Sequence, residues 1–270
     1  MTRDELLQDA LSRSWYHTID LATGATTRGA VDLRAVAPKV LPAELGGRRA
    51  LDVGTFDGFW AFELERRGGE VLATDLDRFD QTEWPPANRA RLARTAADSG
   101  PGERFPLAHE LLRSRVRRIV APIYELTPEL LGGPVDYVVV GDLLLHLRDP
   151  VRGLEAVRSV LSPGGRVLVL EELNIPLSLL RPRSAWASFQ ARGTDFNWWQ
   201  GNYRCLVDWI VLAGFAPPSR KLVYRLQARR PQARWHVALE GGVLRTLKGR
   251  DAPSSPGGER PRPAAGGPRG

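Results

Sequence analysis

Residues 50–77, ALDVGTFDGFWAFELERRGGEVLATDLD, contain the features that decide the fold. The stretch begins with a short apolar run and passes through a turn that holds Gly54 and Gly58. It continues with helical periodicity and ends in a second apolar run closed by acids. This order predicts strand, glycine turn, helix and strand. Asp75 follows the turn by about 20 residues, where nucleotide-binding βαβ units carry the acid that binds ribose hydroxyls.

The glycine spacing decides which nucleotide the turn suits. A dinucleotide fingerprint needs G-x-G-x-x-G, so that a pyrophosphate can approach the helix end. Here the turn reads D-V-G-T-F-D-G from Asp52 to Gly58, and Phe56 stands where a middle glycine would fall. Acids on both sides would repel a pyrophosphate and suit a ligand with an ammonium group. The pattern therefore disfavours a nicotinamide oxidoreductase.

This turn resembles motif I of the class I S-adenosylmethionine (SAM) methyltransferases, D-x-G-x-G-x-G, with Phe56 as the departure. The resemblance implies that Gly54 and Gly58 flank the methionine moiety, that Asp52 helps to hold its amino end and that Asp75 holds the ribose. The predicted cofactor contacts in this stretch are Asp52, Gly54, Thr55, Phe56, Gly58, Asp75 and Leu76. The alternative is an ordinary turn that needs glycine for tight packing.

A second block extends the resemblance. Residues 135–140 form a continuous β-branched apolar run, as expected for a buried parallel strand, and GDLLLHLRDP follows it. A helix over 151–161, a stop at 162–165 and a strand over 166–171 come next. The block resembles the LYHLRDP and L.PGG.LVLE segments of a group of small-molecule and tRNA-modifying methyltransferases. With motif I, the resemblance covers roughly residues 48–240.

The resemblance implies a Rossmann-like, doubly wound α/β fold with a seven-stranded sheet, mostly parallel with an antiparallel terminal strand. Residues 221–226 and 235–239 are predicted to form the hairpin that contains this reversed strand, after a helix over 206–213. The third strand is expected over 115–120. In the family, residues just past that strand contact adenine, which makes Ile123 and Tyr124, together with Pro122, the adenine candidates.

Asp142 and His146 are the first catalytic candidates, because residues at the carboxyl end of the fourth strand face the ligand crevice. A histidine whose pKa is near neutrality can take the proton from an acceptor hydroxyl. His146 stands among leucines, however, and packing is the alternative role. His17 is a rival base and His109 a weaker one.

The N-terminal segment, residues 1–47, is predicted to form a helix and a lid. Thr2 and Glu5 make a capping box for a helix that ends near Ser14. An aromatic strand, a Thr-Gly turn and a return follow, in which Trp15, Tyr16 and His17 would form a lid or acceptor wall, or simply pack on the sheet. A helix is expected over 32–45.

Two long insertions interrupt the strand and helix alternation. The first, residues 78–115, predicts helices near 86–98 and 104–113. The second, residues 173–204, is dense in aromatic side chains, which would line an acceptor pocket or form a satellite hydrophobic cluster. From it we select Trp198, Trp199 and Tyr203 as acceptor-binding candidates.

Composition bounds the remaining choices. At 270 residues and 43% hydrophobic, the chain is expected to form one domain over 48–240 with a disordered tail over 251–270. The single cysteine, Cys205, excludes a disulfide framework and a cysteine-based zinc site, and no metal-ligand spacing is recognised. The absence of an apolar signal core or a membrane-length apolar run predicts a soluble cytoplasmic protein.

The net charge of +7 comes from one segment. Residues 1–216 hold slightly more acids than bases, whereas residues 217–250 hold nine bases against one acid. The basic residues there are Arg220, Lys221, Arg225, Arg229, Arg230, Arg234, Arg245, Lys248 and Arg250. They form either a solvated basic face or a phosphate-contacting patch.

The sequence as a whole predicts a SAM-dependent methyltransferase that acts on a hydroxyl, or a nitrogen, of a small and partly aromatic molecule. One alternative is a tRNA wobble-uridine methyl- or carboxymethyltransferase, to which the chain is similar and which the basic hairpin would serve. The other is a non-catalytic protein that binds SAM through the same fold. The sequence does not determine the oligomeric state.

Overall fold

A computed structural model of the chain describes residues 2–21, 24–86, 88, 90, 102–191, 196–226 and 234–243. Several predictions fall outside these residues: the tail over 251–270, most of the helix over 86–98, and five of the basic residues. Those five are Arg229, Arg230, Arg245, Lys248 and Arg250.

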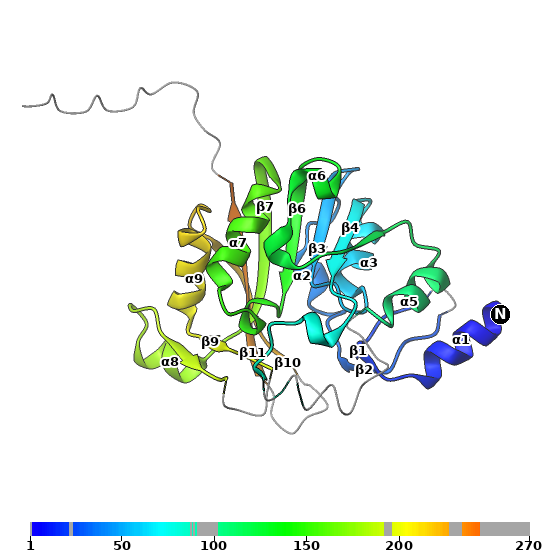
Figure 1. Ribbon diagram of the computed structural model, residues 1–270, viewed down its shortest axis with the longest axis horizontal. Coiled ribbons are helices and arrows are strands. Elements are labelled where there is room, and N and C mark those ends of the chain that lie inside the picture. Colours follow the sequence, from blue (N-terminus) through cyan, green and yellow to red (C-terminus); the bar gives the residue numbers. More distant parts are fainter. Residues whose placement is uncertain are drawn as a thin grey trace, which may run out of the picture.

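A seven-stranded sheet forms the centre of the fold (Figure 1). Its strands are β3 (Arg49–Val53), β4 (Glu70–Asp75), β5 (Arg117–Val120), β6 (Val135–Gly141), β7 (Leu161–Glu172), β10 (Ser219–Leu226) and β11 (Arg234–Gly242). The spatial order is β10-β11-β7-β6-β3-β4-β5. Strands β3 to β7 pair in parallel, and β11 runs antiparallel to both β7 and β10. The predicted doubly wound sheet with a reversed terminal strand is confirmed, and β11 lies inside the sheet between β7 and β10.

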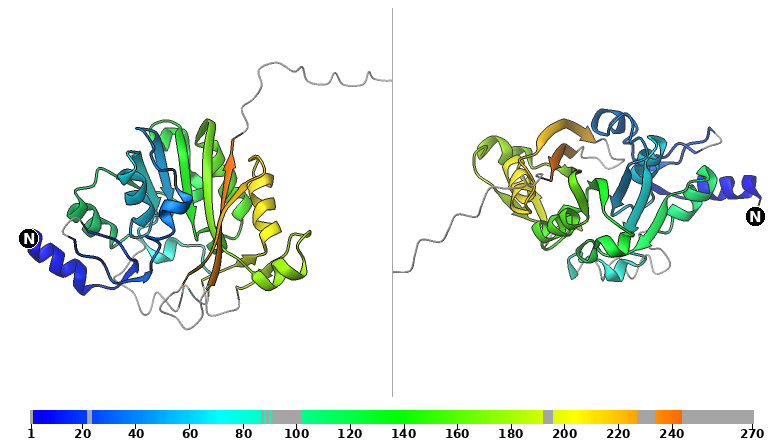
Figure 2. Two further views of the ribbon diagram at one scale, coloured as in Figure 1. Left: turned by 180° about the vertical axis from the view of Figure 1, so that it is seen from behind. Right: turned by 90° about the horizontal axis from the view of Figure 1, so that it is seen from above.

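Helices cover both faces of this sheet (Figure 2). The described α-helices are α1 (Arg3–Ser12), α2 (Ala37–Val40), α3 (Phe59–Arg66), α5 (Phe105–Leu112), α6 (Pro128–Leu131), α7 (Pro150–Ser159), α8 (Ile175–Leu180) and α9 (Tyr203–Leu212). Buried side chains of α1, α2, α3 and α5 form one core cluster with one face of the sheet. Those of α6, α7 and α9 form a second cluster with the other face.

The alternation of side chains along the central strands explains the two clusters. Tyr137 and Val139 of β6 belong to the first cluster, whereas Val138 and Val140 belong to the second. Successive side chains of a strand point to opposite faces, and here both faces are covered by helices. The part of a strand that is buried on both faces needs apolar residues throughout, which is why residues 137–140 of β6 are all apolar, whereas the half-buried Asp136 lies near its start.

The N-terminal segment differs in part from the prediction. The capping box between Thr2 and Glu5 is present, and α1 ends at Ser12. Strand β1 (Trp15–His17) pairs with β2 (Gly29–Val31) in parallel, not as the arms of one hairpin. The antiparallel return is confined to the segment between them, where Asp20 bridges to Thr26.

The predicted helix over 32–45 is wrong. Only the four residues of α2 are helical there, and the next residue, Leu41, is extended with φ −83° and ψ 152°. Leu41 precedes Pro42, and the proline ring disfavours helical geometry in the residue before it. Gly46 and Gly47 then adopt positive φ and turn the chain into β3.

Both insertions contain regular structure. The first includes the 3-10 turn η1 (Phe79–Gln81) and helix α5, which confirms the predicted helix over 104–113. The second includes α8 and a two-stranded antiparallel ribbon of β8 (Ala187–Phe189) and β9 (Trp199–Gly201). Two further 3-10 turns, η2 (Ile123–Glu125) and η3 (Leu144–His146), follow β5 and β6. They lie at the carboxyl edge of the sheet.

Gly58→Ala is expected to destabilise the fold by about 2–4 kcal/mol, because an alanine is strained at this positive φ and its Cβ overpacks the core. Gly58 has φ +96°, and an added Cβ would lie 2.4 Å from the Phe62 ring and 2.9 Å from the Phe105 ring. Gly46→Ala is the control, because its φ is +57° but an added Cβ meets nothing within 4 Å. That variant should lose only about 1 kcal/mol. Urea unfolding measures both, and equal losses would contradict the packing argument.

Candidate active site

A cavity of about 520 Å³ lies at the carboxyl edge of the sheet. Its wall includes the last residues of four strands and the residues that follow two of these strands. They are Val53 and Gly54 at the end of β3, Asp75 at the end of β4, Gly141 and Asp142 at the end of β6, and Glu172 at the end of β7. The chain leaves β3 toward β4 on one side, whereas β6 and β7 lie on the other side. Ligands of doubly wound folds bind at such a switch point. The volume is within the range of small-molecule sites.

The glycine turn and Asp75 form one end of the cavity. Gly54 and Phe56 both have positive φ, at 74° and 52°, so the backbone turns sharply over the end of β3. The amide of Phe56 donates to Asp75 Oδ2 at 2.6 Å, and the amide of Leu76 donates to Oδ1 at 2.7 Å. Burial raises the pKa of Asp75 to about 6, against the effect of these two amides. The turn thus holds the predicted ribose acid in one orientation.

The other predicted motif I contacts lie behind this wall. Asp52 is buried, accepts a hydrogen bond from the Ala61 amide at 3.0 Å and does not line the cavity. Burial raises its pKa to about 7. Thr55 and Gly58 are also absent from the lining. The position of Asp52 shows that it ties the turn to α3, and a direct contact with the cofactor stays a prediction for all three.

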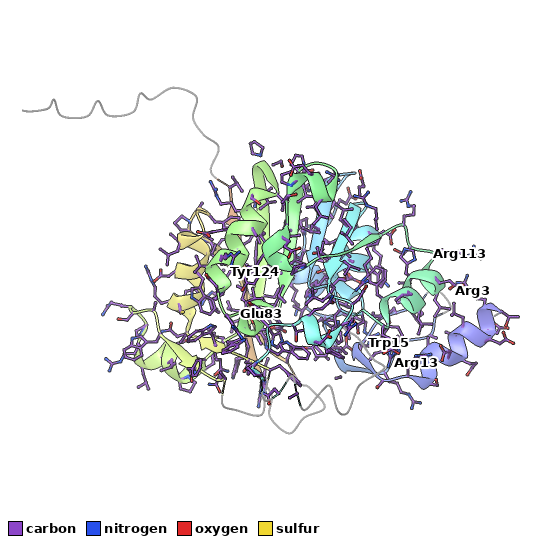
Figure 3. All side chains as sticks on the ribbon, in the orientation of Figure 1. Arg3, Arg13, Trp15, Glu83, Arg113 and Tyr124 are labelled. Atoms are coloured by element: carbon purple, nitrogen blue, oxygen red, sulfur yellow. The ribbon has the colours of Figure 1, made fainter. Side chains whose placement is uncertain are left out.

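The adenine candidates lie on the cavity wall. Pro122, Ile123 and Tyr124 line it from η2 and the residue before this turn. The Tyr124 hydroxyl donates to Glu83 Oε2 at 2.7 Å (Figure 3), and the Arg148 amide donates to the same oxygen at 3.0 Å. Glu83, which sequence reasoning missed, thereby joins the first insertion to the loops after β5 and β6.

The two catalytic candidates both line the cavity. Asp142 follows β6 with φ +46°, and His146 ends η3, where its Nδ1 donates to the Phe196 carbonyl at 3.1 Å. Burial acts to raise the pKa of Asp142, but His236, then His146, face it and hold the pKa below its usual value. The carboxyl of Glu171 lies close behind, and burial and the Asp142 charge raise its pKa well above the usual range. Of these two neighbouring carboxyls, Asp142 is therefore the ionised one.

Part of the cavity is an aromatic wall that only part of the sequence analysis anticipated. Phe79 and Trp84 come from the first insertion and stack with ring centroids 5.2 Å apart. Phe196 comes from the second insertion and lies 4.3 Å from Trp84 between centroids. All three line the cavity. The sequence signal for Phe79 and Trp84 was an aromatic pair within an insertion, but nothing local showed that the two insertions meet.

Of the N-terminal acceptor candidates, Tyr16 and His17 line the cavity and Trp15 does not. Trp15 is 3% exposed, belongs to the first core cluster and donates its indole N–H to the Ala10 carbonyl. It lies beside Arg13 near α1 (Figure 3). Trp15 therefore packs in the core, which was the alternative to a place in the acceptor wall.

The candidates from the second insertion lie outside the lining. The indole of Trp198 donates to the Glu83 carbonyl at 2.7 Å, and that of Trp199 donates to the Arg148 carbonyl at 3.1 Å. Tyr203 begins α9 and packs against the second core cluster. These rings brace the loops behind the cavity, while Phe196 and Asn197 of the same insertion face into it.

A group of polar residues at the ends of β7 and β11 completes the wall. Glu172 accepts from Gln200 at 2.5 Å and from Arg234 at 2.7 Å. His236 lines the cavity, and its Nε2 lies 3.3 Å from Asp142 Oδ1. Sequence analysis missed these residues, because β11 reaches the site only by inserting antiparallel beside β7.

A buried carboxylate fastens the N-terminal lid to the glycine turn. Asp57 Oδ2 accepts the backbone amides of Tyr16 and His17 at 3.1 and 2.7 Å, and Oδ1 lies 2.5 Å from His17 Nδ1. Asp57 is 0% exposed. Since it belongs to the turn itself, the lid and the turn are held as one unit.

Within the described residues, no group of three or more His, Cys, Asp or Glu side chains is arranged to hold a metal ion. None of the helices in the described part of the chain is long and apolar enough to cross a membrane.

Residues 27–210 match the family model of a methyltransferase domain, which is more than half of the chain. The chain belongs to this family. Together with motif I and the strand order, the match shows a class I SAM-dependent methyltransferase.

Two curated relatives match a shorter segment. A ubiquinone biosynthesis O-methyltransferase of Acinetobacter baylyi is 29% identical over 123 residues, which cover 46% of this chain and 43% of that enzyme. A magnesium-protoporphyrin O-methyltransferase of Rhodobacter capsulatus is 33% identical over 118 residues, which cover 44% of this chain and 42% of that enzyme. The matched segments thus span less than half of these relatives.

Solved structures with the same fold cover more of the chain. The N-terminal domain of EvdMO1 with S-adenosylhomocysteine (SAH) bound has a TM-score of 0.59 at 19% identity and covers 90% of this chain and 98% of that domain. A 1,6-didemethyltoxoflavin-N1-methyltransferase of Burkholderia thailandensis has a TM-score of 0.53 at 16% identity, with 78% of each chain covered. These likenesses confirm the fold.

Asp57→Asn is expected to lower the free energy of unfolding by about 3 kcal/mol, because a buried charge that accepts several hydrogen bonds is lost. Asp9→Asn is the control, since Asp9 forms a partly exposed i,i+4 pair with Arg13. It should lose less than about 1 kcal/mol. Urea unfolding compares them, and a loss for Asp57→Asn no larger than the control would show that the lid is held by other contacts.

Proposed function

We propose that this protein transfers the methyl group of SAM to a hydroxyl group of a small, partly aromatic molecule. The observation that carries the proposal is that one cavity is lined by two kinds of group. The Asp75 carboxylate and the glycine turn belong to its wall, and so do the aromatic rings of Phe79, Trp84 and Phe196. The ionised carboxylate of Asp142 belongs to the same wall.

The residues at the turn end fit the nucleoside part of SAM. Each Asp75 oxygen already accepts one amide and retains a second lone pair for a ribose hydroxyl. Ile123 supplies an apolar surface for the adenine, and Tyr124 an aromatic one. Because SAM supplies the sulfonium leaving group, the protein's tasks are to orient the acceptor, exclude water and hold the acceptor's proton.

The aromatic wall favours an aromatic substrate. Offset aromatic rings attract one another, and the Trp84 indole offers the largest flat surface there. A hydroxyl acceptor is favoured over nitrogen because the two curated relatives are O-methyltransferases, and because histidines line the cavity near the Asp142 charge. A planar phenol or catechol with apolar substituents matches this lining.

The tRNA alternative has less support. Among the described basic residues, Lys221 pairs with Glu240 at 3.1 Å, and Arg234 pairs with Glu172 at 2.7 Å. Glu240 also pairs with Arg166, so these ion pairs reduce the positive charge that this segment offers to a phosphate backbone but do not remove it. Binding of RNA stays a prediction, and so does the cytoplasmic location.

Asp75→Asn is expected to weaken SAH binding by about 10- to 100-fold, because charge-assisted hydrogen bonds to the ribose become neutral ones. Calorimetric titration with SAM, SAH and NADH measures the change. The parent protein should bind the first two and not the third. Asp77→Asn is the matched control, since Asp77 pairs with Arg118 and does not line the cavity. Failure of the parent protein to bind SAM and SAH would overturn the proposed function.

Trp84→Leu is expected to raise the KM for an aromatic hydroxyl acceptor about 5- to 10-fold while SAH affinity stays unchanged, because stacking contributes about 1 kcal/mol. A panel from phenol to 3,4-dihydroxybenzoate and flavonols, with SAH release as the readout, supplies the acceptor. Trp186→Leu is the control, since Trp186 is 49% exposed and lies outside the lining. Aniline and its ring-substituted analogues are assayed beside this panel, and turnover on these amines without turnover on any hydroxyl would contradict the hydroxyl assignment.

A further inference from the structure

His236 lies where the reversed strand β11 reaches the cavity. Antiparallel pairing with β7 places it opposite Glu172, so its ring reaches the carboxyl edge of the sheet. The side chain is buried and lines the cavity, and Nε2 is 3.3 Å from Asp142 Oδ1. The Tyr224 ring stacks on the imidazole with centroids 5.4 Å apart and an interplanar angle of 24°. The imidazole is thus held by contacts from three strands and from the loop after β6.

The hydrogen-bond partners of the ring determine which nitrogen is reactive. Nδ1 donates to the Arg234 carbonyl at 3.3 Å, which leaves the lone pair of the neutral imidazole on Nε2. Asp142 Oδ1 lies 3.3 Å from Nε2, but this buried oxygen forms no hydrogen bond within the described residues, so it lies beside the lone pair and not in line with it. Because the ring lines the cavity, the Nε2 lone pair is available to a hydroxyl brought by a ligand. A proton taken up on Nε2 then lies close to the Asp142 charge.

The backbone of Asp142 is arranged for this contact. Its φ of +46° is unusual for a residue other than glycine and aims the carboxylate past the end of β6. Its own amide is occupied by the Leu170 carbonyl at 2.8 Å, so this conformation is held by the sheet. A strained residue with an unpartnered buried oxygen at a cavity wall points to a ligand-dependent role.

We propose that His236 is the general base for the hydroxyl acceptor and that Asp142 is the positioning residue that stabilises the resulting imidazolium. This assignment rests on the proposed function. The acceptor oxygen forms a bond to the methyl carbon, and the carbon–sulfur bond breaks with its electron pair remaining on sulfur. The hydroxyl proton passes to Nε2, and the Asp142 carboxylate, 3.3 Å away, then stabilises the positive charge of the imidazolium while Nδ1 keeps its hydrogen bond to the Arg234 carbonyl.

The charges around His236 make it a stronger base than an ordinary histidine. Burial acts to lower its pKa, but the Asp142 carboxylate and then Glu172 raise it above the ordinary value. The groups facing it are Asp142 after β6, Glu172 of β7, Tyr224 of β10 and the neighbouring Arg234. With a raised pKa, His236 is deprotonated, and thus able to act as a base, only above that pKa.

His146 has a different environment. Its Nδ1 donates to the Phe196 carbonyl, and its ring centroid is 5.9 Å from that of Trp84. These contacts place it in the aromatic wall, where it shapes the acceptor pocket. His146→Gln is therefore the comparison that decides between the two histidines.

The test uses 4-nitrocatechol as the acceptor probe in the presence of SAH, because its phenolate absorbs at longer wavelength than the phenol. The parent protein should bind the probe ionised at a pH about one unit below the pKa of the free probe, since the positive charge of the protonated His236 stabilises the phenolate. His236→Gln should bind SAH within about twofold of the parent and lose this ionisation. The remote His109→Gln should keep it, and His146→Gln should weaken binding of the probe but leave the bound probe ionised.

The same probe with SAM provides kinetics. His236→Gln should lower kcat by about 100-fold or more with little change in KM, and should remove the fall of activity at acid pH that the parent shows. His236→Ala should recover part of kcat when free imidazole is added. If His236→Gln alone folds poorly, the double variant Asp142→Asn with His236→Gln replaces it, because it leaves no unpaired buried charge. The double variant should show the same loss of kcat.

The outcomes distinguish failure of the proposed function from failure of the general-base assignment of His236. If the parent protein binds neither SAH nor the probe, the proposed function fails and the assignment of His236 fails with it. If the parent binds both, and His236→Gln still ionises and methylates the probe at the parental rate, only the general-base assignment is overturned. Loss of ionisation in His146→Gln but not in His236→Gln would assign the base to His146 instead.

Discussion

The parallel pairing of β3 with β6 is the interaction on which the site depends. It sets Val53 beside Val140, so the glycine turn that follows β3 and the Asp142 turn that follows β6 leave the sheet at the same edge. Both strands are apolar on both faces, and helices bury both faces. The sheet therefore withstands the sharp turns at Gly54, Phe56 and Asp142, whose positive φ values the surrounding structure must maintain.

Charge is arranged unevenly along this edge. Asp52 and Asp57 belong to the glycine turn but accept hydrogen bonds from the protein's own amides, whereas Asp75 and Asp142 face the cavity. The first pair holds α3 and the lid in place, and the second pair is available to ligands. Burial raises the pKa of Asp52, so its carboxyl becomes neutral at acid pH, where it can still accept the hydrogen bond from the Ala61 amide. The acids at this edge of the sheet thus serve both structure and binding.

The aromatic wall is built from segments that are distant in the sequence. Trp84 of the first insertion meets Phe196 of the second, and Glu83 links the loops around them through Tyr124 and the Trp198 indole. Local sequence shows that each insertion is aromatic, but not which rings face inward. In the second insertion, the indole N–H groups of Trp198 and Trp199 donate to backbone carbonyls behind the wall, and Phe196 lines the cavity.

The sequence by itself determined the fold class, the glycine turn, the place of Asp75 at the end of the next strand and the aromatic character of the insertions, because each depends on residues close together in the chain. It failed for residues 32–45, where the prolines outweighed helical periodicity, and it did not distinguish the buried Trp15 from the cavity-facing Tyr16. Only the tertiary structure brought His236 to Asp142, since that contact requires β11 to insert antiparallel between β7 and β10. A histidine in a predicted edge hairpin carries no local signal of the carboxylate that it will face, because that carboxylate comes from a loop two strands away in the sheet.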